Sequence, residues 1–300
     1  MVTIADVASQ SPSLFGLADR QWIWLATVVF ASSFVLGTYS ALKLRRKTGR
    51  PYILSLVSFG WILQTIGLYA RGLQYGGCPL ANQFELVQFM VWSAIAIYIF
   101  VGPAFRVSLL GVFTSGFACL FSILSLVFTH WDSPSREPIF GDSPWIETHA
   151  ALALFSYGVF GVLTLTSAMY LLQSRSLKKK KVVGGLFPFL PSIVELNSIN
   201  QRLLSMGVII LTVSLGIGYQ YFAQDHSSVI AIKLTSTLLV WVAYGITLFL
   251  RLRHILSSKR FSWVCIVIFL AALLSLAAVN RNQSEAQSAS WPDRYDSIAS

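Results

Sequence analysis

Charged residues are scarce in this sequence. Only 11% of its 300 residues are Asp, Glu, Lys or Arg, whereas a soluble globular domain is about one quarter charged. A chain with so few charged residues could not form a soluble protein with a surface exposed to water. Its hydrophobic content of 55% also excludes intrinsic disorder, which needs low hydrophobicity and high charge. With a mean hydropathy of +0.66, this composition predicts a polytopic helical membrane protein.

Cysteine is also scarce, and the familiar catalytic motifs are missing. Cys119 and Cys265 lie in apolar segments and are interpreted as small packing residues, while Cys78 has no second loop cysteine to pair with. The lack of Cys-x-x-Cys excludes a thiol–disulfide relay, and the lack of Cys-x-x-Cys-His excludes a c-type cytochrome. Phosphate-binding, dinucleotide-binding, zinc-protease and nucleophile-elbow motifs are absent as well. We therefore expect no independent catalytic activity.

Long apolar runs are abundant. Crossing about 30 Å of hydrocarbon takes roughly 20 helical residues, and no run has the alternating pattern of a barrel strand. We predict an all-α polytopic integral membrane protein with eight transmembrane helices in a domain spanning 21–279, preceded by a segment 1–20 and followed by a polar, disordered tail 280–300. The predicted helices are Gln21–Leu42, Tyr52–Tyr69, Phe84–Gly102, Val107–Phe128, His149–Gln173, Leu203–Phe222, Val229–Leu250 and Phe261–Val279.

Basic residues are distributed unevenly among the gaps between these runs. The gaps after the first, third, fifth and seventh runs hold 16 of the 22 Lys and Arg residues, and only Glu195 of the 12 acidic residues lies in one of them. Because cytoplasmic loops collect Lys and Arg, these gaps are predicted to be cytoplasmic. Eight helices place both termini on one side of the membrane. Both termini are therefore predicted on the outer, periplasmic side of a bacterial inner membrane.

The densest basic run is Lys178–Lys181. It is interpreted as a topology signal in a solvated loop, with attraction to anionic headgroups or to a cytoplasmic partner as the alternative. No aromatic residues interleave with these charges as they do in a nucleic-acid platform, so a nucleic-acid partner is excluded. The expected partner of the chain is the lipid bilayer that surrounds its helices.

Three of the four histidines lie on the predicted outer side. His130 follows the fourth run, His149 begins the fifth, and His226 follows Asp225 between the sixth and seventh. Haem iron takes imidazole ligands at the rim of an apolar, aromatic-lined slot, with the propionates close to water. The pattern fits a haem site, and it also fits the belt of Trp, Tyr and His that anchors helices at membrane interfaces.

Several short segments occur in a particular order. Gly76–Glu85 contains Pro-Leu-Ala-Asn-Gln-Phe-Glu and leads into an apolar helix with Trp92. Thr148–Gly158 starts with an outer-side histidine and ends with a Tyr-Gly pair, Leu190–Asn197 contains a Leu-Pro run, and Gly216–Gly218 precedes the next outer segment. In this order, the segments resemble the cytochrome c assembly transmembrane family, the haem-handling group with CcsA, ResC and HemX types. The similarity extends over residues 52–253.

The sequence departs from this family at three places. The family's tryptophan-rich segment corresponds to Tyr219–Asp225, which keeps aromatic residues and the aspartate but has no tryptophan. The family's histidine before the Pro-Leu-x-Asn run corresponds to Gly77, and a second outer-side histidine has no equivalent after the seventh helix. The chain therefore resembles the HemX-like branch of the family.

The resemblance implies His149 as a haem iron ligand, with a helix-start residue facing headgroups as the alternative. His226, oriented by Asp225, is the candidate for the second ligand, and a short polar turn is its alternative. His130 is interpreted as an interfacial anchor and is the next candidate for the second ligand.

Other side chains also have two interpretations. Tyr219, Tyr221 and Phe222 either stack on the porphyrin in place of tryptophan or belong to the aromatic belt. Lys233 either snorkels to the interface or pairs with a haem propionate. Glu85 either caps its helix, the default, or completes a polar network.

The predicted function is that of a membrane haem-handling protein in c-type cytochrome biogenesis. It would bind b-type haem transiently, without covalent attachment, and present it at the outer face to an apocytochrome c or a second assembly protein. One alternative is a HemX-like, non-catalytic regulator of haem biosynthesis that acts through the segment 174–201. A small-molecule transporter ranks lower, because the sequence has no inverted repeat and no matching pair of broken helices.

Overall fold

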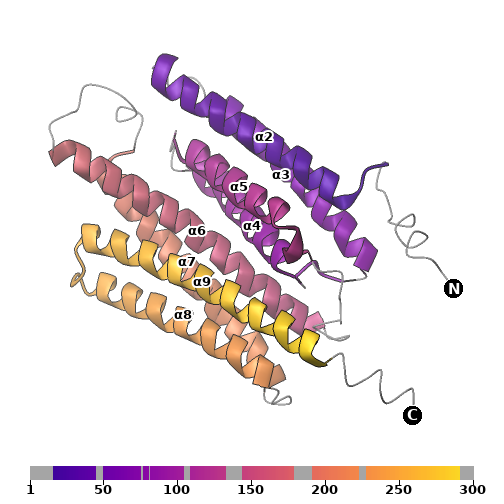
Figure 1. The fold of residues 1–300 in the computed structure, drawn as a ribbon. Coiled ribbons are helices and arrows are strands. Elements are labelled where there is room, and N and C mark those ends of the chain that lie inside the picture. The colour runs from indigo at the N-terminus through magenta and orange to yellow at the C-terminus, as the bar shows by residue number, and fades with distance from the viewer. Residues whose placement is uncertain are drawn as a thin grey trace, which may run out of the picture.

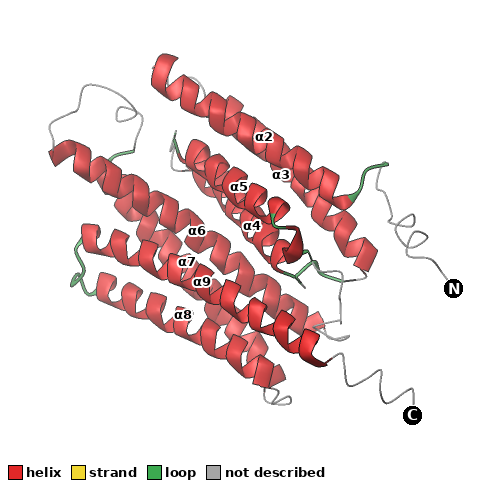
Figure 2. Cartoon of the chain, viewed as in Figure 1, coloured by secondary structure: helices red, strands yellow, loops and turns green. Residues whose placement is uncertain are grey.

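The computed structural model describes residues 16–44, 50–75, 77–80, 82–104, 109–132, 144–178, 191–222 and 228–290, and its elements are helices (Figure 2). The long helices are α2 (Asp19–Tyr39), α3 (Arg50–Tyr75), α4 (Gln83–Ala104), α5 (Leu110–Val127), α6 (Pro144–Lys178), α7 (Ile193–Phe222), α8 (Ser228–Leu252) and α9 (Ser258–Ser290). The π-helical η1 (Ser40–Leu44) continues α2, and the 3-10 turn η3 (Thr129–Trp131) follows α5. All eight long helices contain a stretch long and apolar enough to cross a membrane. The predicted eight-helix, all-α integral membrane protein is confirmed.

The helices form two groups of four (Figure 1). In the first group α2 packs against α3 and α5, and α4 packs against α5; in the second, α6 packs against α7 and α9, and α8 packs against α9. Contacts between α4 and α6 join the two groups. This arrangement makes α6 the central helix of the molecule.

The first turn of α2 and the last turn of α9 lie at one end of the bundle, which we call the terminal end (Figure 1). The opposite end, where α2 ends and α9 begins, is called the basic end, because the gaps rich in Lys and Arg connect helices there. The placement of the terminal end on the outer, periplasmic side of the membrane stays a prediction, as does the division of the chain into 1–20, 21–279 and 280–300.

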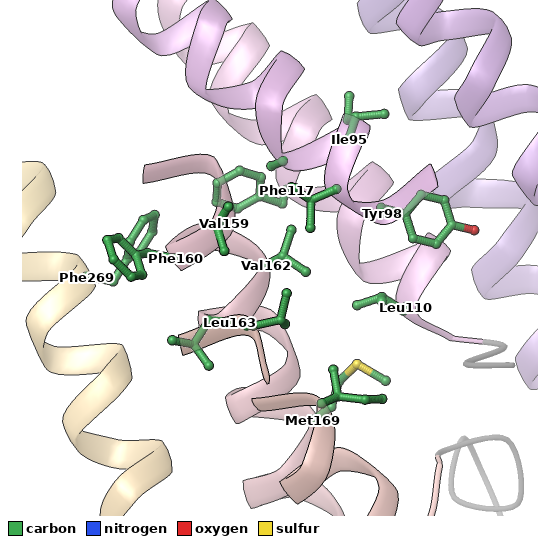
Figure 3. Packing of buried hydrophobic residues seen from close by; sticks show 14 of the residues in the cluster. Ile95, Tyr98, Leu110, Phe117, Val159, Phe160, Val162, Leu163, Met169 and Phe269 are labelled. Atoms are coloured by element: carbon green, nitrogen blue, oxygen red, sulfur yellow. The ribbon is translucent and has the colours of Figure 1, made fainter. Parts of the chain in front are cut away.

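Aromatic side chains from three helices pack around α6. Phe117 of α5 and Phe269 of α9 approach each other over Gly161, with ring centroids 6.4 Å apart (Figure 3). Phe160 stacks on Tyr244 of α8 with centroids 3.8 Å apart, and both side chains are fully buried. Offset aromatic pairs of this kind add about 0.5–1.5 kcal/mol each beyond the area they bury.

Gly158 marks the place where α6 crosses α4. A Cβ atom at this position would lie 2.4 Å from the Cβ of Ser93 and 2.8 Å from the backbone nitrogen of Ala94. Only glycine allows the two backbones to approach this closely, as small residues do in membrane helix pairs. The glycine of the Tyr-Gly pair therefore sets the contact between the two helix groups.

Most of the long helices extend beyond their predicted ends, and α3, α6, α7 and α9 do so by at least five residues. Helix α6 begins at Pro144, because proline is well suited to the first helical position. Helix α7 begins at Ile193, where the hydroxyl of Ser192 accepts a hydrogen bond from the Glu195 backbone N–H at 3.1 Å and caps the helix. Helix α9 continues to Ser290, into the segment predicted as a tail. The long apolar runs predicted the central part of each helix, and turns of mixed or polar composition extend beyond them.

Candidate functional site

His149 lies in the second turn of α6, half-buried against α7 at the terminal end of the bundle. Its Nδ1 is 2.7 Å from the backbone carbonyl oxygen of Ser214. The Ser214 hydroxyl in turn donates to the backbone carbonyl of His149 at 2.8 Å. Two reciprocal contacts thus fix the imidazole between α6 and α7.

Gly218 provides the space for this ring one helical turn further along α7. A Cβ atom on Gly218 would lie 2.6 Å from Nδ1 of His149, which is closer than non-bonded atoms approach. At Gly216, two residues earlier, no neighbouring atom of the described residues lies within 4 Å of the corresponding position. Of the two glycines in the Gly-Ile-Gly segment, Gly218 is the one that the imidazole requires.

The hydrogen bond determines which nitrogen of His149 can bind a metal. A carbonyl oxygen only accepts hydrogen bonds, so Nδ1 is the donor and carries a proton. In the neutral ring the lone pair then resides on Nε2, which is the nitrogen that would ligate iron. Metal-binding histidines commonly donate their other N–H to a backbone carbonyl in this way.

For the other predicted site residues, the structure gives the position of some and does not describe others. Tyr219 follows Gly218 and is 73% exposed, and Tyr221 and Phe222 lie in the last turn of α7. Lys233 lies near the start of α8. Asp225 and His226 lie outside the described residues.

His130 belongs to a separate aromatic group in η3, also at the terminal end. Its ring is exposed and makes edge contacts with Phe128 and Trp131, with centroids 6.0 and 6.2 Å away. Trp131 stacks on Phe128 at 5.1 Å. His149 is thus held between α6 and α7, while His130 is displayed on a turn that follows α5.

Arg71 is the centre of a buried ion-pair cluster that the sequence analysis did not anticipate. Its Nε donates to Glu85 of α4 at 2.6 Å, and its Nη1 donates to Asp19 of α2 at 2.6 Å. Its Nη2 pairs with Asp132, directly after η3. The side chains of Arg71 and Glu85 are 3% and 0% exposed, so this pairing compensates a charge that could not otherwise be buried.

Asp132 has further partners. Arg20 donates to it at 2.9 Å, and the Asn82 side-chain amide donates to it at 3.2 Å. With its groups in their ordinary charge states, the cluster has three carboxylates and two guanidinium groups. An excess of negative charge makes it a poor site for an anion such as a propionate, and it instead holds the ends of α2, α3, α4 and η3 together.

The structure shows what Glu85 does at the start of α4. Asn82 caps α4, because its side-chain oxygen accepts from the Glu85 backbone N–H at 2.9 Å. The Glu85 carboxylate pairs with Arg71, so the network interpretation is confirmed. The same carboxylate lies in the first turn of α4, where a negative charge also favours the start of the helix. The sequence signal was an arginine and a glutamate both close to predicted helix ends, on consecutive helices.

Polar contacts continue inward from the cluster. The Gln64 amide donates to the Gln88 side-chain oxygen at 2.8 Å, and the Gln88 amide donates to the Ser125 hydroxyl at 2.7 Å. Both glutamines are fully buried. These hydrogen bonds join α3, α4 and α5 within the membrane-spanning part of the bundle.

Cys78 and Glu147 connect the loop before α4 to the first turn of α6. The Cys78 backbone N–H donates to the Glu147 carboxylate at 3.4 Å, and a Cβ atom on Gly77 would lie 3.0 Å from the same carboxylate. Burial raises the pKa of the Cys78 thiol to about 11, with the Glu147 and Glu85 carboxylates adding to the effect. At neutral pH the thiol is therefore protonated and is a poor ligand for iron.

An apolar cavity of about 330 Å³ lies between α3 and the start of α4. Its lining includes Tyr69, Phe89 and Trp92, and Gly77 lies at its edge. The Trp92 indole is fixed by a hydrogen bond to the Thr65 hydroxyl at 2.8 Å. The cavity offers aromatic surface, but the position that corresponds to the family's histidine contributes no imidazole. Among the described residues, no group of three or more His, Cys, Asp or Glu side chains is placed to hold a bare metal ion.

Residues 80–283 match the model of the family described as cytochrome C assembly protein. The chain belongs to this family. The sequence-based resemblance is confirmed, and the matched region contains His149, Ser214 and Gly218 together with Glu85 and Asp132. Arg71 lies before it. This member of the family is an integral membrane protein, and its described residues contain eight candidate membrane spans.

Proteins named HemX and CcsA align with most of the chain. Protein HemX of Brevibacillus brevis is 27% identical over 240 residues, which cover 79% of this chain and 87% of the relative. Protein HemX of Bacillus subtilis (strain 168) is 26% identical, covering 77% and 84%. Cytochrome c biogenesis protein CcsA of Synechococcus sp. (strain RCC307) is 24% identical, covering 74% and 79%.

Proposed function

We propose that this protein handles haem in c-type cytochrome biogenesis, at the outer face of a bacterial inner membrane, with His149 as an iron ligand. One observation supports this most: His149 donates from Nδ1 to the Ser214 carbonyl and rests on Gly218, which directs metal binding to Nε2. The membership in the cytochrome c assembly family and the names of the CcsA relatives supply the biological context.

The residues at the terminal end fit haem better than a bare metal ion. Haem needs one or two axial ligands and apolar or aromatic surface for the macrocycle. The chain offers the oriented imidazole of His149, the exposed ring of Tyr219 next to Gly218 in the sequence, and an aromatic cavity whose lining includes Gly77. The contact between Glu147 and the Cys78 backbone places that cavity's edge beside the helix that holds His149.

The role of the chain is to bind and present haem, which is the cargo. His149 would hold the iron, and Tyr219, Tyr221 and Phe222 would contact the ring. Lys233 is a candidate partner for a propionate, since a cation near the membrane interface is well placed for one. Asp225 would orient His226 as the second ligand, with His130 as the next candidate. The recipient would be an apocytochrome c or a second assembly protein.

Binding is expected to be weak and exchangeable. Tyrosine and phenylalanine stand where the family has tryptophan, and aromatic contacts contribute about 0.5–1.5 kcal/mol each. Because about 1.4 kcal/mol corresponds to one decade of affinity, this replacement should weaken haem binding by roughly tenfold. Weak binding suits a protein that passes its cargo on.

Haem titration into the protein in nanodiscs tests this proposal. The wild type should show saturable binding, and Gly218→Ala should weaken it at least tenfold because the new methyl group displaces the imidazole. Gly216→Ala is the matched control and should bind like the wild type, since no described residue has an atom within 4 Å of that Cβ position. His226→Ala should convert six-coordinate, low-spin haem to a five-coordinate form.

Three results would count against parts of the proposal. Equal haem affinity of Gly218→Ala and Gly216→Ala would contradict the assignment of His149 as an iron ligand. Survival of the low-spin spectrum in His226→Ala would move the second ligand elsewhere, with His130→Ala as the next variant. The absence of saturable binding to the wild type would favour a regulatory relative that does not transfer haem.

A further inference from the structure

The cavity of about 330 Å³ between α3 and α4 lies at the depth of the membrane and is open on one side. Its walls are the last part of α3 and the first part of α4, both within candidate membrane spans. At 1.5 Å per residue, the α3 wall from Thr65 to Leu73 is about 12 Å long. The loop residues Gly77 and Pro79 line the cavity at the terminal end of the bundle. On the α3 wall, Tyr69 and Leu73 are 60% and 53% exposed, so this side faces the surrounding bilayer.

The polar side-chain groups deep in the cavity already have partners. The Thr65 hydroxyl donates to the Trp61 carbonyl at 2.7 Å and accepts from the Trp92 indole at 2.8 Å. The Trp92 ring stacks on Trp61 with centroids 5.3 Å apart, and the ring of Phe89 lies 5.4 Å from it. These contacts fix an aromatic wall that needs no hydrogen bond from a ligand. An acyl chain, which has no polar atoms to satisfy, is suited to such a wall.

The charge beside the loop end of the cavity is negative. The Glu147 oxygen that accepts from the Cys78 backbone N–H lies 3.0 Å from the Cβ position of Gly77, which lines the cavity. Glu147 forms no ion pair with any described residue. The cluster around Arg71, the residue before Gly72 of the lining, has three carboxylates and two guanidinium groups. A cationic headgroup therefore complements this end of the cavity, and an anionic one is repelled.

We propose that this cavity binds one molecule of phosphatidylethanolamine, with an acyl chain against Phe89 and Trp92 and the ammonium group at Glu147. The ammonium group donates a charge-assisted hydrogen bond to the carboxylate. The headgroup then lies at the terminal end of the bundle, and the chain extends along α3 into the membrane. A soluble amine would not use the aromatic wall, and an anionic lipid would not use the carboxylate.

The lipid site does not depend on iron binding by His149. Glu147 and His149 are two residues apart in α6, which is about 200° around a helix of 3.6 residues per turn. Accordingly, Glu147 contacts the loop before α4, and His149 contacts α7. Haem in contact with the aromatic wall of the cavity would compete with the lipid, so lipid binding is measured on haem-free protein.

Native mass spectrometry of the haem-free protein in mild detergent tests the proposal, with phosphatidylethanolamine and phosphatidylglycerol of identical acyl chains as probes. One phosphatidylethanolamine should bind per chain, about fivefold more tightly than phosphatidylglycerol. Glu147→Gln should weaken phosphatidylethanolamine binding about fivefold, which corresponds to about 1 kcal/mol, and remove the preference between the lipids. Glutamine can still accept from the Cys78 N–H, so only the charge is lost. The matched control is Glu195→Gln, in the first turn of α7 at the basic end, and it should leave the affinity unchanged.

A second pair of variants tests the acyl-chain part of the site. Leu73→Trp places a large ring at the open side of the cavity and should weaken the binding of both lipids, while Glu147 is retained. The control is Leu120→Trp in α5, at a leucine that is 63% exposed and outside the cavity lining. O-phosphoethanolamine, which has the headgroup without the chains, should not compete at concentrations near the lipid's.

Four results would overturn the proposal. Equal effects of Glu147→Gln and Glu195→Gln, or equal binding of the two lipids to the wild type, would show that the carboxylate does not select the headgroup. Equal binding by Leu73→Trp and Leu120→Trp would show that the lipid lies outside the cavity. Efficient competition by O-phosphoethanolamine would show that the acyl chain contributes nothing. Because no haem is present, each of these results leaves the haem proposal unaffected.

Discussion

Arg71 is the most constrained charge among the described residues, because three carboxylates from α2, α4 and the turn after α5 surround its guanidinium group. Removing it would leave Glu85 buried without its cation. Such losses cost about 3–5 kcal/mol. We therefore expect Arg71→Gln to lower the free energy of unfolding by that amount, measured by denaturant titration in detergent micelles.

The matched control is Arg20→Gln. Arg20 donates to the same Asp132, but its side chain is 32% exposed, so its loss should cost no more than about 1 kcal/mol. The double variant Arg71→Gln, Glu85→Gln should recover part of the lost stability, because it removes the unpaired carboxylate as well. Equal destabilisation by the two single variants would contradict this description of the cluster.

The Cys78 thiol provides a prediction about pH. Its pKa of about 11 keeps the reactive thiolate a small fraction of the population at neutral pH. In a protein whose other cysteines are replaced by alanine, the rate of alkylation by iodoacetamide should still rise about tenfold per pH unit between pH 8 and 10. Glu147→Gln should raise the rate throughout this range, because removal of a nearby negative charge lowers the thiol pKa. A rate that levels off below pH 9 would mean that the thiol is not buried as described.

The sequence alone was enough to predict some residues of the candidate site. His149 was found because an outer-side histidine at a helix start is conspicuous, and Glu85 was found because it lies in the Pro-Leu-x-Asn segment. Arg71 was missed because the apolar run ends at Tyr69, so the arginine was counted as a loop charge, although α3 continues to Tyr75. Ser214 could not be predicted, since only the packing of α7 against α6 brings its carbonyl to the imidazole.

At the scale of elements, the crossing of α4 and α6 determines how the two helix groups fit together. Gly158→Ala would place a methyl group 2.4 Å from the Cβ of Ser93, so the helices must separate. Overpacking of this kind costs about 1–3 kcal/mol. We expect a lower melting temperature, measured by the loss of helical circular dichroism on heating.

Gly245 of α8 is the control for this substitution, because in the described part of the chain no neighbouring atom lies within 4 Å of its Cβ position. Gly245→Ala should leave the melting temperature unchanged or raise it slightly, since alanine favours helix by about 0.5–1 kcal/mol over glycine. A drop equal to that of Gly158→Ala would assign the effect to glycine in general and not to the crossing.

Helix positions were predictable and helix lengths were not. Each predicted span overlaps one long helix of the structure, because a run of roughly 20 apolar residues in a membrane has little choice but to be helical. The extra turns of α6 and α7 mix polar with apolar residues, so they do not continue an uninterrupted apolar run. Their starts depend on Pro144 and on the Ser192 cap, which apolarity does not register.

At the scale of the whole molecule, the even number of helices places the start of α2 and the end of α9 at one end (Figure 1). The distribution of Lys and Arg predicts that this end faces the periplasm. A reporter active only in the cytoplasm should be active when fused after Lys181 and inactive when fused after Ser300. Activity after Ser300 would reverse the orientation and place His149 near the cytoplasm.

The grouping of the helices was beyond prediction from the sequence. Apolar periodicity does not say which faces meet in lipid, where no hydrophobic contrast separates a buried face from an exposed one. The central place of α6 depends on small residues such as Gly158 and Gly161, which are informative only once their neighbours are known. The candidate site follows from this grouping, because α6 holds His149 against α7 and touches the loop before α4 through Glu147.

The central claim is that His149 binds haem iron, and the absorption spectrum of protein purified from haem-replete cells tests it most directly. The wild type should show a Soret band. In His149→Ala the band should weaken, and imidazole added to the variant should shift it as the free ligand takes the vacated position. Identical bands in the two proteins, or no band in either, would contradict the assignment of His149 as the haem ligand.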